Sequence, residues 1–126
     1  MQTNVAILIG GIEQSDIRIV DYDPEWPERY QTQCRIIADA LGNSLLRIEH
    51  VGSTAVPGLA AKPIIDILIV VAHSADELSY LPRLEAAGYE LRVREPGFHQ
   101  HRMLRTRRGT CTCTCGRRTP PGARGN

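Results

Sequence analysis

The chain has 126 residues and a formal net charge of +1, with 42% hydrophobic and 23% charged residues. This length fits one small domain with a modest core, and the ordinary composition is typical of a globular protein. No apolar stretch approaches the roughly 20 residues that cross a bilayer. The apolar run at residues 5–9 lacks the flanking residues of a signal peptide. We therefore expect a cytoplasmic protein without a membrane partner.

The charge is unevenly distributed along the chain. Residues 109–126 contain three arginines and no acid, which leaves 12 basic residues (15 minus 3) and 14 acidic residues before them. Residues 1–108 therefore carry a net charge of −2. No basic stripe with interleaved aromatic residues occurs in this part of the chain, which argues against a nucleic-acid partner.

Residues 1–17 are expected to be a weakly ordered leader, and residues 18–108 to be the folded domain. A first helix is predicted to begin near Asp23 and Pro24, because an acceptor side chain followed by proline is typical of a helix start. Apolar residues then recur at helical spacing up to Gly42, which is typical of a helix end.

A second helix is predicted from residue 74 to Gly88, kinked or split at Pro82 because proline disrupts a helix interior. Alternating apolar residues predict further strands. These strands are expected over residues 44–51, 89–94 and 98–104.

Residues 64–71 form an eight-residue run that is apolar except for Asp66. A run this rich in Ile and Val, following Pro63, predicts a strand covered on both faces. A lone carboxylate there costs on the order of several kcal/mol unless it is paired, protonated or bound to a metal. Asp66 is therefore a candidate functional residue. The order of the elements predicts an α/β (α+β) fold, with a small mixed sheet and flanking helices.

The turn formed by Gly52, Ser53 and Thr54 is the second candidate feature. Its backbone N–H groups and hydroxyl are suited to a phosphate, and Asp66 is suited to a divalent metal that bridges phosphate oxygens. Magnesium is the expected cofactor. The segment is not a P-loop, because no Gly-Lys-Ser or Gly-Lys-Thr follows the first glycine.

Three further residues are candidates for ligand contact, each with an alternative. His50 either contacts a ligand beside the turn or is a satisfied core histidine. Lys62 either neutralises a phosphate or is a solvated loop lysine. Arg102 either faces the cleft or lies on the surface. Glu49 also precedes the turn, but alternation places it on the face opposite His50, so it is not counted as a ligand.

Two stretches resemble the signature sequences of the GrpB family. They are Tyr-Asp-Pro-Glu-Trp-Pro at residues 22–27 and the longer segment 48–67, which contains Glu-His-Val-Gly-Ser-Thr and ends in Lys-Pro-Ile-Ile-Asp-Ile. The resemblance covers residues 19–108 and implies the nucleotidyltransferase superfamily with its DNA polymerase beta-like fold. That superfamily's pattern ends in two acids separated by one apolar residue. Asp66 matches the first acid, but Leu68 stands at the position of the second.

The resemblance implies binding of a nucleotide or another phosphorylated small molecule, with metal-dependent nucleotidyl transfer as the reaction. Two-metal chemistry needs several converging carboxylates, so Leu68 leaves catalytic activity open. The alternative is a non-catalytic module of the same fold. A link to coenzyme A metabolism is implied for such a module, because GrpB-like domains occur fused to dephospho-CoA kinase.

Residues 109–126 differ in composition from the rest of the chain and allow two direct interpretations. Cys111, Cys113 and Cys115 alternate with threonines and are suited to a soft metal such as zinc or copper(I). A closed zinc site needs a fourth ligand, for which the candidates are Cys34, His99 and His101. Alternatively, the segment is a disordered tail, since no large apolar side chain follows Leu104.

A third interpretation is a frameshift between residues 104 and 109. Read one base earlier, the codons of residues 110–116 encode Leu, Val or Met in alternation with His or Tyr, a pattern typical of a half-buried strand. On this interpretation the chain is truncated. We therefore expect the domain to lack its last strand and C-terminal helix, and to be marginally stable.

Overall fold

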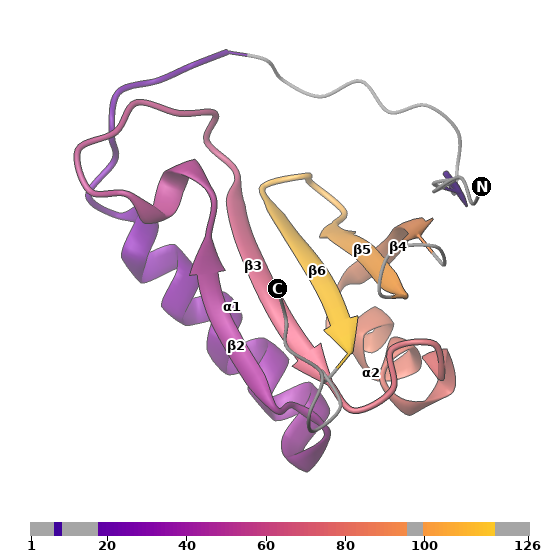
Figure 1. Ribbon diagram of the computed structural model, residues 1–126. Helices are drawn as coiled ribbons and strands as arrows, with labels where there is room; N and C mark the ends of the chain where they lie inside the picture. The colour runs from indigo at the N-terminus through magenta and orange to yellow at the C-terminus, as the bar shows by residue number, and fades with distance from the viewer. Residues whose placement is uncertain (1–6, 9–17, 96–99, 118–126) are drawn as a thin grey trace, which may run out of the picture.

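The structure is a computed structural model that describes residues 7–8, 18–95 and 100–117. These residues form a six-stranded mixed sheet with the order β1-β4-β5-β6-β3-β2 (Figure 1). The strands are β1 (Ile7–Leu8), β2 (Arg47–Val51), β3 (Ile65–Val71), β4 (Tyr89–Glu95), β5 (His101–Thr106) and β6 (Cys111–Arg117). The α-helices are α1 (Trp26–Leu41) and α2 (Leu81–Ala86). The predicted fold class, a small mixed sheet with helices, is confirmed.

The central strand β3 pairs antiparallel with β2 and parallel with β6. Its residues are alternately buried and partly buried, beginning with buried Ile65 and partly buried Asp66. The buried set packs with Trp26, Ile37 and Leu41 of α1 in the core. Within the described residues, the predicted cover is therefore complete on one face of β3 and partial on the other. Among the described residues both helices lie behind the sheet in Figure 1, and Asp66 is on the opposite face.

Helix α1 begins at Trp26 rather than beside Pro24, because the Asp23 side chain binds a backbone N–H group just before the first helical residue. Its Oδ1 accepts a hydrogen bond of 2.9 Å from the backbone N–H of Glu25. Pro27 occupies the first turn, where the missing N–H has no intrahelical partner to lose. Gly42 follows the helix at φ +53°, as its position in the sequence predicts.

The second predicted helix is shorter than expected. A 3-10 turn, η3 (Glu77–Ser79), precedes the six-residue helix α2, and Pro82 lies in the first turn of α2. The predicted helix is thus split just before Pro82, and this proline lies in the first turn of α2, where proline is tolerated. Leu84 is buried and joins α2 to the core.

Strand β6 corrects the expectations of disorder from residue 109 and of a missing last strand. It lies between β5 and β3, with Cys111, Cys113 and Cys115 at most 2% exposed in the core. Residues 118–126 lie outside the described residues, as does the leader apart from 7–8, which pair with β4. No described helix has the length and apolar character that crossing a membrane requires.

Candidate functional site

A cavity of about 430 Å³ lies beside the turn that connects β2 to the segment leading into β3. Its polar lining comes from Ser53, Thr54, Lys62 and Asp66. This volume lies within the range of roughly 300–1,000 Å³ that is usual for small-molecule sites. The structure therefore brings four of the sequence-predicted site residues together around one cavity.

The carboxylate of Asp66 lies directly against Gly52, a fifth predicted residue. A Cβ atom added to Gly52 would overlap Oδ2 of Asp66 and lie 3.1 Å from its Cγ. Gly52 also has φ +77° and ψ −171°, a backbone conformation that is accessible almost only to glycine. The glycine therefore provides both the sharp turn and the space in which the carboxylate sits.

Thr112 of β6 positions the same carboxylate from the other side. Asp66 and Thr112 are direct partners in the parallel register of β3 and β6, and the Thr112 hydroxyl donates a 2.5 Å hydrogen bond to Oδ1. Thr112 is not predicted as a site residue from the sequence, because residues 109–126 differ in composition from the rest of the chain and are expected to form a tail. The signal was present in the alternation of residues 111–115, whose register only the folded sheet reveals.

His50 and Thr54 form a hydrogen-bonded support beneath the turn. The Thr54 hydroxyl donates to the Ile64 carbonyl at 3.1 Å and lies 2.9 Å from Nε2 of His50. Because a hydroxyl has one proton, His50 must donate through Nε2 in this arrangement. His50 stacks on Tyr30 with ring centroids 4.8 Å apart. Burial lowers the pKa of His50 although Asp66 acts to raise it, which favours the neutral ring.

This support favours the interpretation of His50 as a satisfied core histidine. The residue is not part of the cavity lining and acts on Thr54 from below, as a satisfied histidine at the edge of the core does. Thr54 is 2% exposed, and its hydroxyl already has both a donor and an acceptor partner. Ser53 and Lys62, which are both exposed, are the residues that remain available to an anion.

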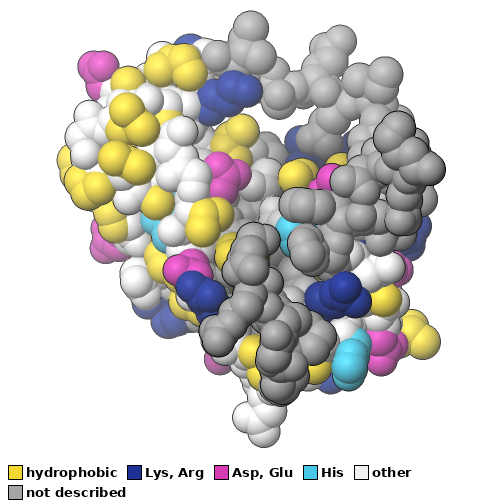
Figure 2. All heavy atoms as spheres, viewed as in Figure 1, with side chains coloured by type: hydrophobic (Ala, Val, Ile, Leu, Met, Phe, Trp, Pro, Cys, Tyr) yellow, Lys and Arg dark blue, Asp and Glu magenta, His cyan; other side chains and the backbone are white. Residues whose placement is uncertain are grey.

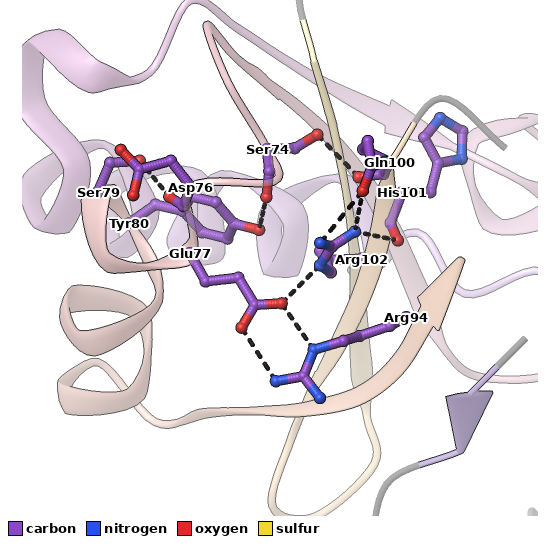
Figure 3. A network of polar contacts seen from close by, with 9 residues as sticks. All are labelled: Ser74, Asp76, Glu77, Ser79, Tyr80, Arg94, Gln100, His101 and Arg102. Atoms are coloured by element: carbon purple, nitrogen blue, oxygen red, sulfur yellow. Dashed lines mark hydrogen bonds and ion pairs between the residues drawn. The ribbon is translucent and has the colours of Figure 1, made fainter. Parts of the chain in front are cut away.

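Arg102 is in a different part of the molecule, and both interpretations of it are wrong. It is buried, and its Nε donates a 2.6 Å hydrogen bond to Glu77 (Figure 3). Arg94 donates two further hydrogen bonds to the same carboxylate. The bonds from Arg94, more than those from Arg102, lower the pKa of Glu77 to about 2 although burial raises it. Arg102 therefore holds η3 to the sheet.

The position of the expected second acid remains occupied by Leu68, on the same sheet face as Asp66. The cross-strand partner of Leu68 is Glu49, which shares this face and forms an ion pair with Arg47. Glu49 thus lies on the sheet face opposite to His50, as predicted, and this is the face on which Asp66 lies. No group of three or more residues suited to a metal occurs within residues 18–95 and 100–117.

The three cysteines of β6 face away from the site. Burial raises the pKa of Cys111 to about 11 and that of Cys115 to about 12, and it raises the pKa of the fully buried Cys113 as well. Thiols in such surroundings resist the deprotonation that metal binding requires. The described residues therefore do not support the metal-binding interpretation of the tail, and His99 lies outside them.

Comparisons with known proteins agree with this architecture. The family model described as GrpB protein matches residues 16–116. The crystal structure of conserved protein GrpB from Enterococcus faecalis superposes with a TM-score of 0.69 at 30% identity, covering 79% of this chain and 61% of that one.

Curated relatives extend the similarity. A UPF0157 protein of Halalkalibacterium halodurans is 53% identical over 91 residues, which are 72% of this chain and 47% of the relative. A UPF0157 protein of Streptomyces coelicolor is 56% identical over 99 residues, or 79% of this chain and 51% of the relative. A protein of Mycolicibacterium paratuberculosis named dephospho-CoA kinase is 46% identical over 62% of this chain and 20% of its own length. The chain thus spans about half the length of the two UPF0157 relatives.

Proposed function

Because the chain belongs to the GrpB family, we propose that it binds a nucleotide or another phosphorylated small molecule at the cavity beside Gly52. One observation carries this proposal. A hydroxyl from Ser53, a cation from Lys62 and a carboxylate from Asp66 line the same cavity of about 430 Å³. The hydroxyl and the cation suit phosphate oxygens, whereas the carboxylate suits a metal ion.

The charges of the cavity imply that the phosphate arrives with magnesium. Lys62 and Asp66 cancel to zero, so the carboxylate opposes a free phosphate anion. Mg²⁺ commonly binds to one or two carboxylates together with substrate phosphates and waters, and a single Asp66 fits this arrangement. The ion would supply charge neutralisation at the phosphate, while Ser53 and Lys62 hold the phosphate oxygens and Thr112 orients Asp66.

The finer part of the proposal is membership of the nucleotidyltransferase superfamily, with metal-dependent nucleotidyl transfer as the reaction. Its support is the Gly52–Ser53 turn at the end of β2 with Asp66 on the neighbouring strand. The donor set does not fit a two-metal centre, because Leu68 replaces the second acid. This replacement favours a second candidate function, a non-catalytic module that binds the ligand and leaves the chemistry to another domain.

Binding measured with and without magnesium tests the common part of both candidates. With Mg²⁺, Asp66→Asn should weaken nucleoside triphosphate binding about tenfold or more, because the carboxylate ligand is lost. Without Mg²⁺, the same variant should bind as well as or better than the unmodified chain, because a repelling charge has been removed. Isothermal titration calorimetry measures both. Equal weakening in both conditions would contradict the metal role of Asp66.

Two controls sharpen the experiment. Asp39→Asn changes an exposed aspartate of α1 and should leave both affinities unchanged. Lys62→Gln should weaken binding with and without Mg²⁺, since this cation faces the phosphate directly. Dephospho-coenzyme A should be included among the ligands that are tested, because some relatives are named dephospho-CoA kinase. Pyrophosphate release from a nucleoside triphosphate then separates the enzyme from the non-catalytic module.

A further inference from the structure

The cavity beside Gly52 has two chemically different parts. The polar residues Ser53, Lys62 and Asp66 form one part, and Ile19, Ala60 and Ala61 contribute an apolar part. A phosphate and a sugar are strongly hydrated, so aliphatic side chains contribute little to their binding. The composition of the lining therefore carries information about the chemical group that is attached to the phosphate in the ligand.

Exposed aliphatic side chains continue the apolar part beyond the cavity. Ile19 is 60% exposed, and Val56 and Leu59, on the loop that leads to Ala60, are 48% and 44% exposed. Figure 2 shows hydrophobic side chains gathered over this part of the molecule, at the upper left of the view. Single exposed aliphatic residues are common, but a group beside a cavity is typical of a binding surface.

The backbone holds Ile19 in place at the cavity. Val20 and Ala61 form an isolated bridge through two hydrogen bonds, of 2.9 Å from the Val20 N–H and 3.0 Å from the Ala61 N–H. Val20 packs against the core, so its neighbour Ile19 points to the other side, where it lines the cavity. An apolar contact that is already fixed costs little ordering entropy when a ligand arrives.

We propose that the ligand of this cavity is amphipathic, with an apolar group attached directly to the phosphate that Ser53 and Lys62 bind. This inference rests on the proposed function and narrows its substrate class to phosphorylated small molecules other than nucleotides, because the phosphate of a nucleotide is attached to a sugar. The apolar group lies against Ile19 and the loop at residues 56–60, while the phosphate lies against Ser53 and Lys62. Phosphate esters of alkyl or aryl alcohols have this chemistry, whereas glycerol 3-phosphate and ribose 5-phosphate do not.

A matched series of phosphates tests the inference in the presence of Mg²⁺. Calorimetry on the full chain compares inorganic phosphate, glycerol 3-phosphate, hexyl phosphate and phenyl phosphate. Hexyl or phenyl phosphate should bind about tenfold more tightly than glycerol 3-phosphate, because part of the apolar group leaves water. Ile19→Ser should reduce this preference without changing the affinity for inorganic phosphate. Leu78→Ser, at a leucine that is 84% exposed and outside the cavity lining, is the control and should keep the preference.

The outcomes distinguish this inference from the proposed function. Equal affinities for all four phosphates would overturn the amphipathic ligand and leave phosphate binding intact. A preference that is undiminished in Ile19→Ser would also overturn it, as would hexanol binding as tightly as hexyl phosphate. The absence of binding for every phosphate would remove the proposed function together with the inference.

Discussion

The position of the Asp66 carboxylate requires a glycine at residue 52, because any larger residue there would overlap the carboxylate. We expect Gly52→Ala to lower the free energy of unfolding by about 3 kcal/mol, because it combines backbone strain with a steric overlap. The strain arises from φ +77°, and the overlap arises between the new Cβ and Oδ2 of Asp66. Urea denaturation followed by circular dichroism measures the loss.

Two variants separate these causes. Gly58→Ala also changes a glycine with positive φ, but a Cβ there meets nothing within 4 Å, so a loss of about 1 kcal/mol is expected. Asp66→Ala removes the overlapping oxygen, and Gly52→Ala should cost less in that background. An equal cost in both backgrounds would show that Asp66 does not contact the turn.

Glu77 gives the protein a defined acid sensitivity. Its pKa falls from 4.5 in the unfolded chain to about 2 in the folded protein, chiefly through the hydrogen bonds from Arg94. A carboxyl with a lowered folded pKa stabilises the protein above its unfolded pKa, and this contribution disappears as the pH falls towards 2. We expect Glu77 to contribute roughly 3 kcal/mol at pH 7 and progressively less between about pH 5 and pH 2.

Glu77→Gln isolates this contribution from those of other carboxylates. The variant should be less stable than the unmodified chain at pH 7, because buried Arg102 loses its charged partner. The difference between the two proteins should shrink at pH 3, as measured by urea midpoints. Glu85→Gln, at an exposed position of α2, should show no such convergence. A pH-independent difference for Glu77→Gln would indicate packing and not charge.

At the scale of elements, local sequence patterns predicted the helices and strands well, but they did not predict the contacts between distant segments. Gly42 ends α1 and the apolar run becomes β3, because chain geometry and hydrophobicity alone favour both. The second predicted helix is split near Pro82, as expected, into η3 and α2. The sequence did not predict the tertiary contact of Glu77 in η3 with Arg94 and Arg102 of two strands. No local pattern contains that contact.

In the candidate site, too, the residues that are close in sequence could be predicted and the distant one could not. Gly52, Ser53, Lys62 and Asp66 lie in one stretch of sequence, and turn chemistry together with an isolated acid was enough to place them near one another. Thr112 reaches Asp66 from 46 residues away along the chain. Such a contact depends on the parallel pairing of β3 with β6, which composition does not predict.

The reactivity of the thiols in β6 distinguishes a core strand from a disordered tail. Cys111, Cys113 and Cys115 are at most 2% exposed, and burial raises the pKa of each thiol, so few thiolates are present at pH 8. We expect these three thiols to react slowly with a thiol-labelling reagent in the native protein, and all four cysteines to react rapidly in guanidinium. Rapid reaction of three or more native thiols would contradict the insertion of β6 into the sheet.

At the scale of the whole molecule, the strand pattern bears on the frameshift hypothesis. Residues 111, 113 and 115 face the core, while Thr112 and Thr114 share the face of Asp66. Read one base earlier, the core positions become Leu, Val or Met and the other two become His or Tyr. The shifted reading thus places larger apolar side chains inside and polar rings beside the candidate site, as a half-buried strand requires.

We therefore predict that the coding DNA carries a one-base shift between the codons of residues 104 and 109, which sequencing of the genomic DNA checks. The present chain should then melt below about 50 °C, because small thiols fill a part of the core that suits larger residues. Replacing Cys111, Cys113 and Cys115 together by Val should raise the melting temperature by about 4 °C or more. Cys34→Val, a replacement outside β6, is the control and should give no comparable rise. A lower melting temperature for the triple variant would mean that the core around β6 is fitted to cysteine.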